Sequence, residues 1–272
     1  MNLIASVSGV IAVCALSVSA NVASTLWGYR VNDTSMVSTS EWASVWQACS
    51  GLRQSPVDIV TTVNSSTNMM APITFSGSCP VYNMIEPPKS LEADVTGGNC
   101  TVSVNNATYH MVQFHVHAPS EHTVNGKQLD GEIHFVHKSS DGQALLVVGL
   151  FLMLGPTSDE WLNPVLDALE HVSSTEQTAV STVNLGSYSS LATSAAATGG
   201  IYNYPGSLTT PPCNETVDWW VVKKPIIISS ADFNRVHLNL VEYHATDNGR
   251  NARPTQPLNG RVVTRYHKMN DQ

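Results

Sequence analysis

The sequence predicts a mainly β protein with peripheral helices, folded as a single domain. Between about Ile73 and Val222, short runs rich in β-branched and aromatic residues alternate with Gly, Asn, Asp and Pro, which is typical of antiparallel sheets. The chain has 272 residues, a length that suits one large β-rich domain. No internal repeat suggests a second unit.

The strand-like runs follow one another along this region. They read ITFSG, NCTVSVNN, TYHMVQFHVH, GEIHFVHK, QALLVVGLFLML and TVDWWVVKK. Apolar residues at helical spacing predict a packing helix over 159–172, with one face made of Trp161, Val165, Leu169 and Val172. A second helix is expected after Ser229, which has capping-box spacing to Asp232. The Ser/Thr/Ala-rich segment 173–200 shows little periodicity and is expected to be a surface loop.

Residues 1–20 are expected to be a secretory signal peptide. The stretch is apolar, carries no charged side chain, and ends in small residues, with Val18 and Ala20 placed for cleavage. A membrane anchor is the alternative, but the run is short for spanning and polar residues follow it directly. The C-terminal sequence RVVTRYHKMNDQ has no hydrophobic tail. We therefore expect residues 21–272 to be a secreted domain without a membrane anchor.

The cysteines and sequons agree with secretion. Cys14 leaves with the signal, and an even number remains for two disulfides, with three connectivities open: Cys49, Cys79, Cys100 and Cys213. Glycosylation sequons begin at Asn32, Asn64, Asn99, Asn106 and Asn214. The net charge is −8 and no basic run is present, so nucleic-acid binding is not expected. No obligate protein partner is expected either.

Histidines are concentrated in one segment, with six of the ten between residues 110 and 137. His115 and His117 are two apart in a strand-like run, so both rings project from the same face. His134 lies on the next strand pattern, after the turn-rich VNGKQLDG, and can face the other two. Three neutral imidazoles hold Zn²⁺ and leave a fourth position for water, the pattern of a catalytic site. The alternative is three buried histidines that serve packing only.

Two polar residues share the strand faces of these histidines. Gln113 precedes His115 by two residues, and Glu132 precedes His134 by two. Each can accept a hydrogen bond from the outer N–H of its histidine ring. A buried Glu132 without such a donor would be destabilising by several kcal/mol, so its place in an apolar strand favours the metal site.

With these motifs in view, the chain resembles the α-class carbonic anhydrases over most of its length. The matching motifs are WGY at Trp27, QSPVDI at Gln54, QFHVH at Gln113, SEHTV at Ser120, EIHFV at Glu132, YPGSLTTPPC at Tyr204 and NARPTQPLNGR at Asn251. The resemblance implies a large, mostly antiparallel, twisted sheet of about ten strands with zinc in a conical cleft. It also implies zinc-dependent reversible hydration of carbon dioxide to bicarbonate and a proton by zinc-bound hydroxide.

The resemblance implies a role for each site residue. The zinc ligands would be His115, His117 and His134, supported by Gln113, Glu132 and the backbone around Asn251. Thr209 would accept a hydrogen bond from the zinc-bound hydroxide and donate its own proton to Glu121. The carbon dioxide pocket would be formed by Val136, Val147, Leu208, Thr210 and Trp219.

In secreted members of the family, cysteines at the places of Cys49 and Cys213 form a disulfide, which leaves Cys79 and Cys100 to each other. Fast members carry a proton-shuttling histidine before the first ligand strand. Here that stretch reads GGNCTVSV, with Asn99 or Cys100 in the histidine's place, so turnover is expected to depend on external buffer. Leu129 stands where the family usually has an aromatic residue, and we expect only a packing change.

Two other functions share part of this pattern. A cupin also uses H-x-H followed by Glu, and His115, His117 and Glu121 match that spacing, but the cupin's second Gly/Pro motif with its last histidine is absent. A non-catalytic binding protein on the carbonic anhydrase scaffold is the other alternative. The complete set of three ligands with Glu121 and Thr209 favours the enzyme.

Overall fold

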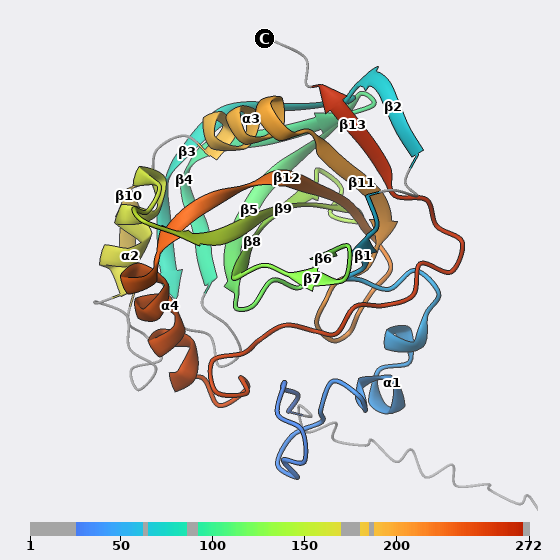
Figure 1. Ribbon diagram of the computed structural model, residues 1–272, viewed down its shortest axis with the longest axis vertical. Helices are drawn as coiled ribbons and strands as arrows, with labels where there is room; N and C mark the ends of the chain where they lie inside the picture. Colours follow the sequence, from blue (N-terminus) through green and yellow to red (C-terminus); the bar gives the residue numbers. More distant parts are fainter. Residues whose placement is uncertain (1–25, 62–64, 86–91, 170–179, 185–187, 269–272) are drawn as a thin grey trace, which may run out of the picture.

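A ten-stranded sheet is the centre of the molecule (Figure 1). The computed structural model describes residues 26–61, 65–85, 92–169, 180–184 and 188–268. In spatial order the strands are β10 (Val180–Asn184), β3 (Ile73–Ile85), β4 (Glu92–Val104), β5 (Ala107–His117), β8 (Gly131–Ser139), β9 (Leu145–Gly155), β12 (Val217–Ser229), β11 (Ile201–Gly206), β13 (Thr264–Lys268) and β2 (Ser65–Met70). Most neighbours are antiparallel, and only β9–β12 and β13–β2 run parallel. The predicted fold class is confirmed.

A second, three-stranded sheet contains β1 (Asp58–Ile59), β6 (Thr123–Val124) and β7 (Lys127–Gln128). Its strands are short, and β1 pairs with β6 in parallel. The Asp58 carboxylate accepts hydrogen bonds from the Thr123 hydroxyl at 2.6 Å and from the Gly126 backbone at 2.8 Å. These bonds tie the segment after the His115/His117 strand to the N-terminal part of the chain.

The helices lie at the periphery of the large sheet (Figure 1). Near the N-terminus are α1 (Trp42–Val45) and the 3-10 helix η1 (Gln47–Ser50). The predicted helix over 159–172 is present as η2 (Glu160–Leu162) and α2 (Asn163–Leu169), and its last residues lie outside the described ranges. The predicted helix after Ser229 is α4 (Ser230–Glu242), where the Ser229 hydroxyl accepts from the Asp232 backbone at 3.1 Å. No helix among the described residues is long and apolar enough to cross a membrane.

The expectation of a surface loop over 173–200 is wrong where the structure describes this segment. It contains β10 and the helix α3 (Tyr188–Gly199), which packs against β3 and β12. The buried face of α3 includes Tyr188, Ala192, Ala195 and Ala196. These residues do follow helical spacing, but alanine is a weak hydrophobic signal, so the pattern resembled a polar loop.

Both faces of β8 are buried, and they carry different chemistry. Ile133 and Phe135 point into the main hydrophobic core, whereas Val136 belongs to a second cluster with Val147 and Trp219. Because side chains alternate along a strand, His134 shares its face with Val136. The sheet therefore uses one face for its main core and the other for the candidate site.

Candidate metal centre

Three histidine rings converge on the face of β5 and β8 that lies opposite the main core. His115 and His134 are direct partners in the β5–β8 ladder, and His117 follows two residues along β5. The ring centroids of His117 and His134 are 4.5 Å apart, and those of His115 and His134 are 5.3 Å apart. One nitrogen of each ring lies within 4.8 Å of the others, so a single ion can be reached by all three.

The outer ring nitrogens of His115 and His117 have acceptors that fix their orientation. The His115 Nδ1 is 2.8 Å from the Gln113 Oε1, and the His117 Nδ1 is 2.8 Å from the Asn251 carbonyl oxygen. The Asn251 amide accepts from the Ala118 backbone at 2.8 Å, which holds that carbonyl against the strand. With the proton on Nδ1, each ring directs an unprotonated Nε2 toward the other histidines.

Glu132 lies behind His134 and is completely buried. Its Oε1 is 3.0 Å from the His134 Nε2, close enough to interact although the N–H is not well aligned, and 2.7 Å from the His122 Nδ1. Its Oε2 accepts from the backbone nitrogens of Glu121 and His122 at 3.0 and 2.9 Å. Burial opposes ionisation, but His122 and His134 hold the pKa of Glu132 well below its usual range.

The histidine set fits a zinc ion. Burial, aided by the neighbouring rings, lowers the pKa of His115 well below its ordinary value, and burial lowers that of His117. Both rings are therefore neutral, the form that binds a metal. The His117 Nε2 is buried without a hydrogen-bond partner among the described residues, as expected of an atom that awaits a ligand. Neutral nitrogens from three histidines are a usual donor set of catalytic zinc.

Glu121 is buried beside the histidines, with its Oε2 3.4 Å from the His117 Nε2. Its Oε1 accepts from the Arg253 backbone at 2.8 Å. Within the described part of the chain, the Oε2 has no hydrogen-bond partner, so the expected bond from the Thr209 hydroxyl is not formed in this structure. Thr209 lies nearby in the lining of the same cavity as His117.

The histidines line a cavity of about 470 Å³. Every residue expected to form the carbon dioxide pocket is among its lining residues: Val136, Val147, Leu208, Thr210 and Trp219. Leu129, where the family usually has an aromatic residue, is partly buried against the apolar cluster that contains three of these walls. The cavity thus combines three ring nitrogens with a largely apolar wall.

Three lining residues were not singled out from the sequence: Trp27, Tyr29 and Glu92. Trp27 and Tyr29 belong to the WGY motif that supported the resemblance, so a signal for them existed. Glu92 had none. Its Oε2 accepts from the Gln113 Nε2 at 3.0 Å, and burial together with nearby Asp94 raises the pKa of Glu92 to about 7.

The expectation that Asn99 or Cys100 occupies the position of the family's proton-shuttling histidine is wrong. Cys100 is buried in the main core, and Asn99 contacts His110 at 3.1 Å on the exposed side of the sheet. Glu92, at the other end of β4, is the residue opposite His115. On β4, six residues separate Asp94 from Thr101, but on β5 only two residues separate their partners, Gln113 and His110. The number of residues along the chain therefore does not give the register of the two strands, which explains the error. Residues 86–91, which precede Glu92, lie outside the described ranges.

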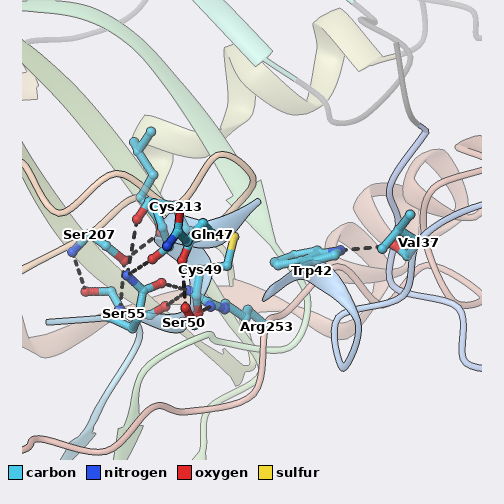
Figure 2. The surroundings of a disulfide bond; sticks show 12 residues. Val37, Trp42, Gln47, Cys49, Ser50, Ser55, Ser207, Cys213 and Arg253 are labelled. Atoms are coloured by element: carbon cyan, nitrogen blue, oxygen red, sulfur yellow. Dashed lines mark hydrogen bonds between the residues drawn. A yellow bond between two sulfur atoms is a disulfide. The ribbon is translucent and has the colours of Figure 1, made fainter. Parts of the chain in front are cut away.

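The two disulfides join Cys49 to Cys213 and Cys79 to Cys100. Figure 2 shows the first, with the Arg253 side chain beside it. The Arg253 guanidinium donates to the carbonyl oxygens of Ser55 at 2.8 Å and of Cys49 at 3.3 Å. The Cys213 nitrogen donates to the carbonyl of Thr210 at 2.9 Å. The disulfide therefore ties the turn next to Thr209 to a network of buried hydrogen bonds.

Comparison with known proteins agrees with this geometry. The family model of the eukaryotic-type carbonic anhydrases matches residues 37–267. A carbonic anhydrase of Pectobacterium atrosepticum is 32% identical over 243 residues, covering 87% of this chain and 89% of the relative. Alpha carbonic anhydrase 3 of Arabidopsis thaliana is 32% identical over 232 residues, covering 82% and 79%.

Solved structures share the fold. The α-carbonic anhydrase of Thermovibrio ammonificans, in complex with the inhibitor sulfanilamide, has a TM-score of 0.74 at 29% identity and covers 88% of this chain and 99% of its own. Dioscorin, solved in complex with ascorbate, has a TM-score of 0.76 at 25% identity and covers 90% and 99%. A mixed ten-stranded sheet with a three-histidine site defines the class as that of the zinc-dependent carbonic anhydrases. The chain belongs to the eukaryotic-type, or α, carbonic anhydrase family.

Proposed function

We propose that this protein catalyses the reversible hydration of carbon dioxide to bicarbonate and a proton, with one zinc ion held by His115, His117 and His134. The observation that carries the proposal is the convergence of three ring nitrogens within 4.8 Å in the lining of a largely apolar cavity. A bound zinc ion supplies the acidity that makes water a nucleophile at neutral pH, an effect whose best-known example is carbonic anhydrase itself.

The groups behind the histidines keep each ring in the form that this chemistry needs. Gln113 and the Asn251 carbonyl accept the outer protons of His115 and His117, and the Glu132 Oε1, 3.0 Å from the His134 Nε2, is proposed to take the same part for His134. Rings held in this way neither rotate nor exchange the protonated nitrogen, so the donor set stays organised for the ion.

Thr209 and Glu121 are proposed to orient the attacking water. The buried Glu121 Oε2 has no partner among the described residues, and the Thr209 hydroxyl is the proposed donor to it. Once the Thr209 proton is directed at Glu121, the Thr209 oxygen can only accept from the attacking water. That bond would turn a lone pair of the water toward the substrate carbon.

The apolar walls are proposed to bind carbon dioxide, which is small and carries no charge. Val136, Val147 and Trp219 are buried, and Leu208 completes the apolar wall. Thr210 supplies a polar edge that suits bicarbonate. The cavity would therefore favour an apolar substrate over bulk water and release a charged product.

A zinc titration of the metal-free full-length protein tests this function. We expect carbon dioxide hydration to rise in proportion to added zinc and to reach its plateau at one ion per chain, because the three histidines form one site. A protein that binds one zinc ion and remains inactive would be a binding protein on the same scaffold. A protein that binds no zinc would contradict the proposal at its first step.

We also propose that proton transfer proceeds without the usual histidine shuttle. Among the described residues that line the cavity, the only histidines are His115, His117 and His134, the proposed zinc ligands. Without an internal carrier, regeneration of the nucleophile depends on a buffer that enters the cavity. We expect the turnover number to increase with imidazole concentration at fixed pH and ionic strength. A turnover number that does not respond to imidazole would contradict this point.

Secretion is the proposed setting. The two disulfides are the supporting observation, since such bonds persist in oxidising compartments. We propose that residues 1–20 are a signal peptide and that residues 21–272 form a single domain. Glycosylation is proposed for the sequons whose asparagines are exposed, namely Asn32, Asn99, Asn106 and Asn214, whereas the sequon at Asn64 lies outside the described residues.

A further inference from the structure

Of the three groups that hold the histidine rings, only Gln113 has a side chain that can turn over. Asn251 offers a backbone carbonyl and Glu132 a carboxylate, and an ionised carboxylate can only accept. The Gln113 amide has an oxygen that accepts and a nitrogen that donates. If its nitrogen faced His115, the ring proton would move to the Nε2, and that atom could no longer bind a metal.

Glu92 is placed to prevent this rotation. Its Oε2 lies 3.0 Å from the Gln113 Nε2, while the Gln113 Oε1 lies 2.8 Å from the His115 Nδ1. The Glu92 Oε2 accepts from the amide nitrogen, whereas an amide oxygen in the same place would face another acceptor, so the Gln113 side chain is held with its oxygen toward His115.

The strand ladder makes this contact possible. In the pairing of β4 with β5, Glu92 is opposite His115 and Asp94 is opposite Gln113, so all four residues share one face of the sheet. Glu92 reaches Gln113 diagonally across the ladder. Glu92 is partly buried and belongs to the lining of the cavity.

We propose that Glu92 is a positioning residue for the metal centre: it holds the Gln113 amide nitrogen and thereby keeps the His115 proton on Nδ1, with Nε2 free for the ion. The inference rests on the proposed function, because it concerns the same three-histidine site. Glu92 acts only through Gln113 and touches no reacting atom.

Zinc release from the loaded full-length protein into an excess of chelator tests the proposal. Glu92→Met keeps the length of the side chain but removes the acceptor, and we expect zinc release to become about tenfold faster. Glu92→Gln should stay within about twofold of the wild type, because its amide oxygen still accepts the bond. As a control, Asp141→Asn removes a carboxylate from the exposed turn between β8 and β9 and should also leave the rate within about twofold.

The same substitution in a protein that lacks the Gln113 amide shows whether Glu92 acts through Gln113. In a Gln113→Leu protein, Glu92→Met should accelerate zinc release no further, because the amide that Glu92 holds is gone. Nitrogen-15 NMR of the metal-free protein should show the His115 proton on Nδ1 in the wild type and a mixture of tautomers in Glu92→Met. If the methionine variant fails to fold, Glu92→Ser takes its place.

The outcomes separate this inference from the proposed function. A wild type that binds no zinc would refute the function itself. A wild type that binds one zinc ion, together with a Glu92→Met protein that releases zinc at the wild-type rate and keeps a single His115 tautomer, would refute the role of Glu92 alone. An equal acceleration by Glu92→Met in the Gln113→Leu background would also refute it.

Discussion

His137 lies on β8 three residues beyond His134, yet it is buried in a different environment. Its Nδ1 is 3.3 Å from the Leu146 carbonyl oxygen, its ring centroid is 5.5 Å from that of Tyr188, and its Nε2 has no hydrogen-bond partner among the described residues. Burial lowers the pKa of His137 from 6.5 to about 4. A histidine next to the metal site thus serves as a neutral core residue.

Acid should destabilise the protein through His137. In the unfolded chain His137 takes up a proton near its ordinary pKa, whereas in the folded protein it resists protonation until about pH 4. Stability is therefore full above pH 6.5 and falls as the pH drops toward 4, by roughly 3 kcal/mol in total. His137→Gln keeps an N–H donor for the Leu146 carbonyl and does not titrate.

Urea unfolding of metal-free wild type and His137→Gln at pH 7.5 and pH 4.5 measures this effect. The wild type should lose about 2.5 kcal/mol more than the variant between the two pH values. Other histidines titrate equally in both proteins and cancel in the comparison. An equal loss in both proteins would show that His137 does not carry the acid sensitivity.

At the scale of elements, the two disulfides connect different parts of the fold. Cys49–Cys213 joins η1 to the turn that follows Thr209 and closes a sequence separation of 164 residues. Cys79–Cys100 joins β3 to β4, and both of its cysteines are buried in the main core. The first bridge is next to the cavity lining and the second is not.

Removal of either disulfide should lower stability, but only removal of Cys49–Cys213 should lower activity. The double substitution Cys49→Ser with Cys213→Ser is expected to lower the free energy of unfolding by roughly 2–5 kcal/mol. It should also reduce kcat/KM by about tenfold, because Thr209 and Thr210 lose their anchor. The matched control, Cys79→Ser with Cys100→Ser, should lower stability and leave kcat/KM within about twofold of the wild type.

Calorimetry and hydration assays on the two double variants check both parts of this prediction. An unchanged kcat/KM in the Cys49/Cys213 variant would show that the turn holds Thr209 without the bridge. Equal losses of activity in both variants would point to a general effect of lower stability.

Across the whole molecule, what the sequence could predict depended on whether neighbouring strands pair without interruption. His115 and His134 are predictable because residues two apart on a strand share a face and the β5–β8 ladder has no register shift from Gln113 to His117. Glu92 was missed because the extra residues on β4 displace the ladder by an amount that no local pattern reveals. The helix α3 was missed because its buried face is mainly alanine.

Long-range contacts were predicted only where a family resemblance supplied them. Asn251 reaches His117 across 134 positions of sequence, and spacing alone gives no reason to join them. The Cys49–Cys213 disulfide likewise joins residues far apart in the sequence, and only the family resemblance predicted it. The hydrogen bond between the His115 ring and the Gln113 Oε1 is local, by contrast, and follows from the two-residue period of a strand.

The central claim is that the three histidines form the catalytic zinc site of a carbonic anhydrase. Stopped-flow carbon dioxide hydration by the purified protein, with zinc content measured on the same sample and His117→Ala in parallel, tests it most directly. We predict close to one zinc ion per wild-type chain with rapid hydration, and loss of both in the variant. A wild type that holds zinc but does not hydrate carbon dioxide, or a variant that remains fully active, would contradict the claim.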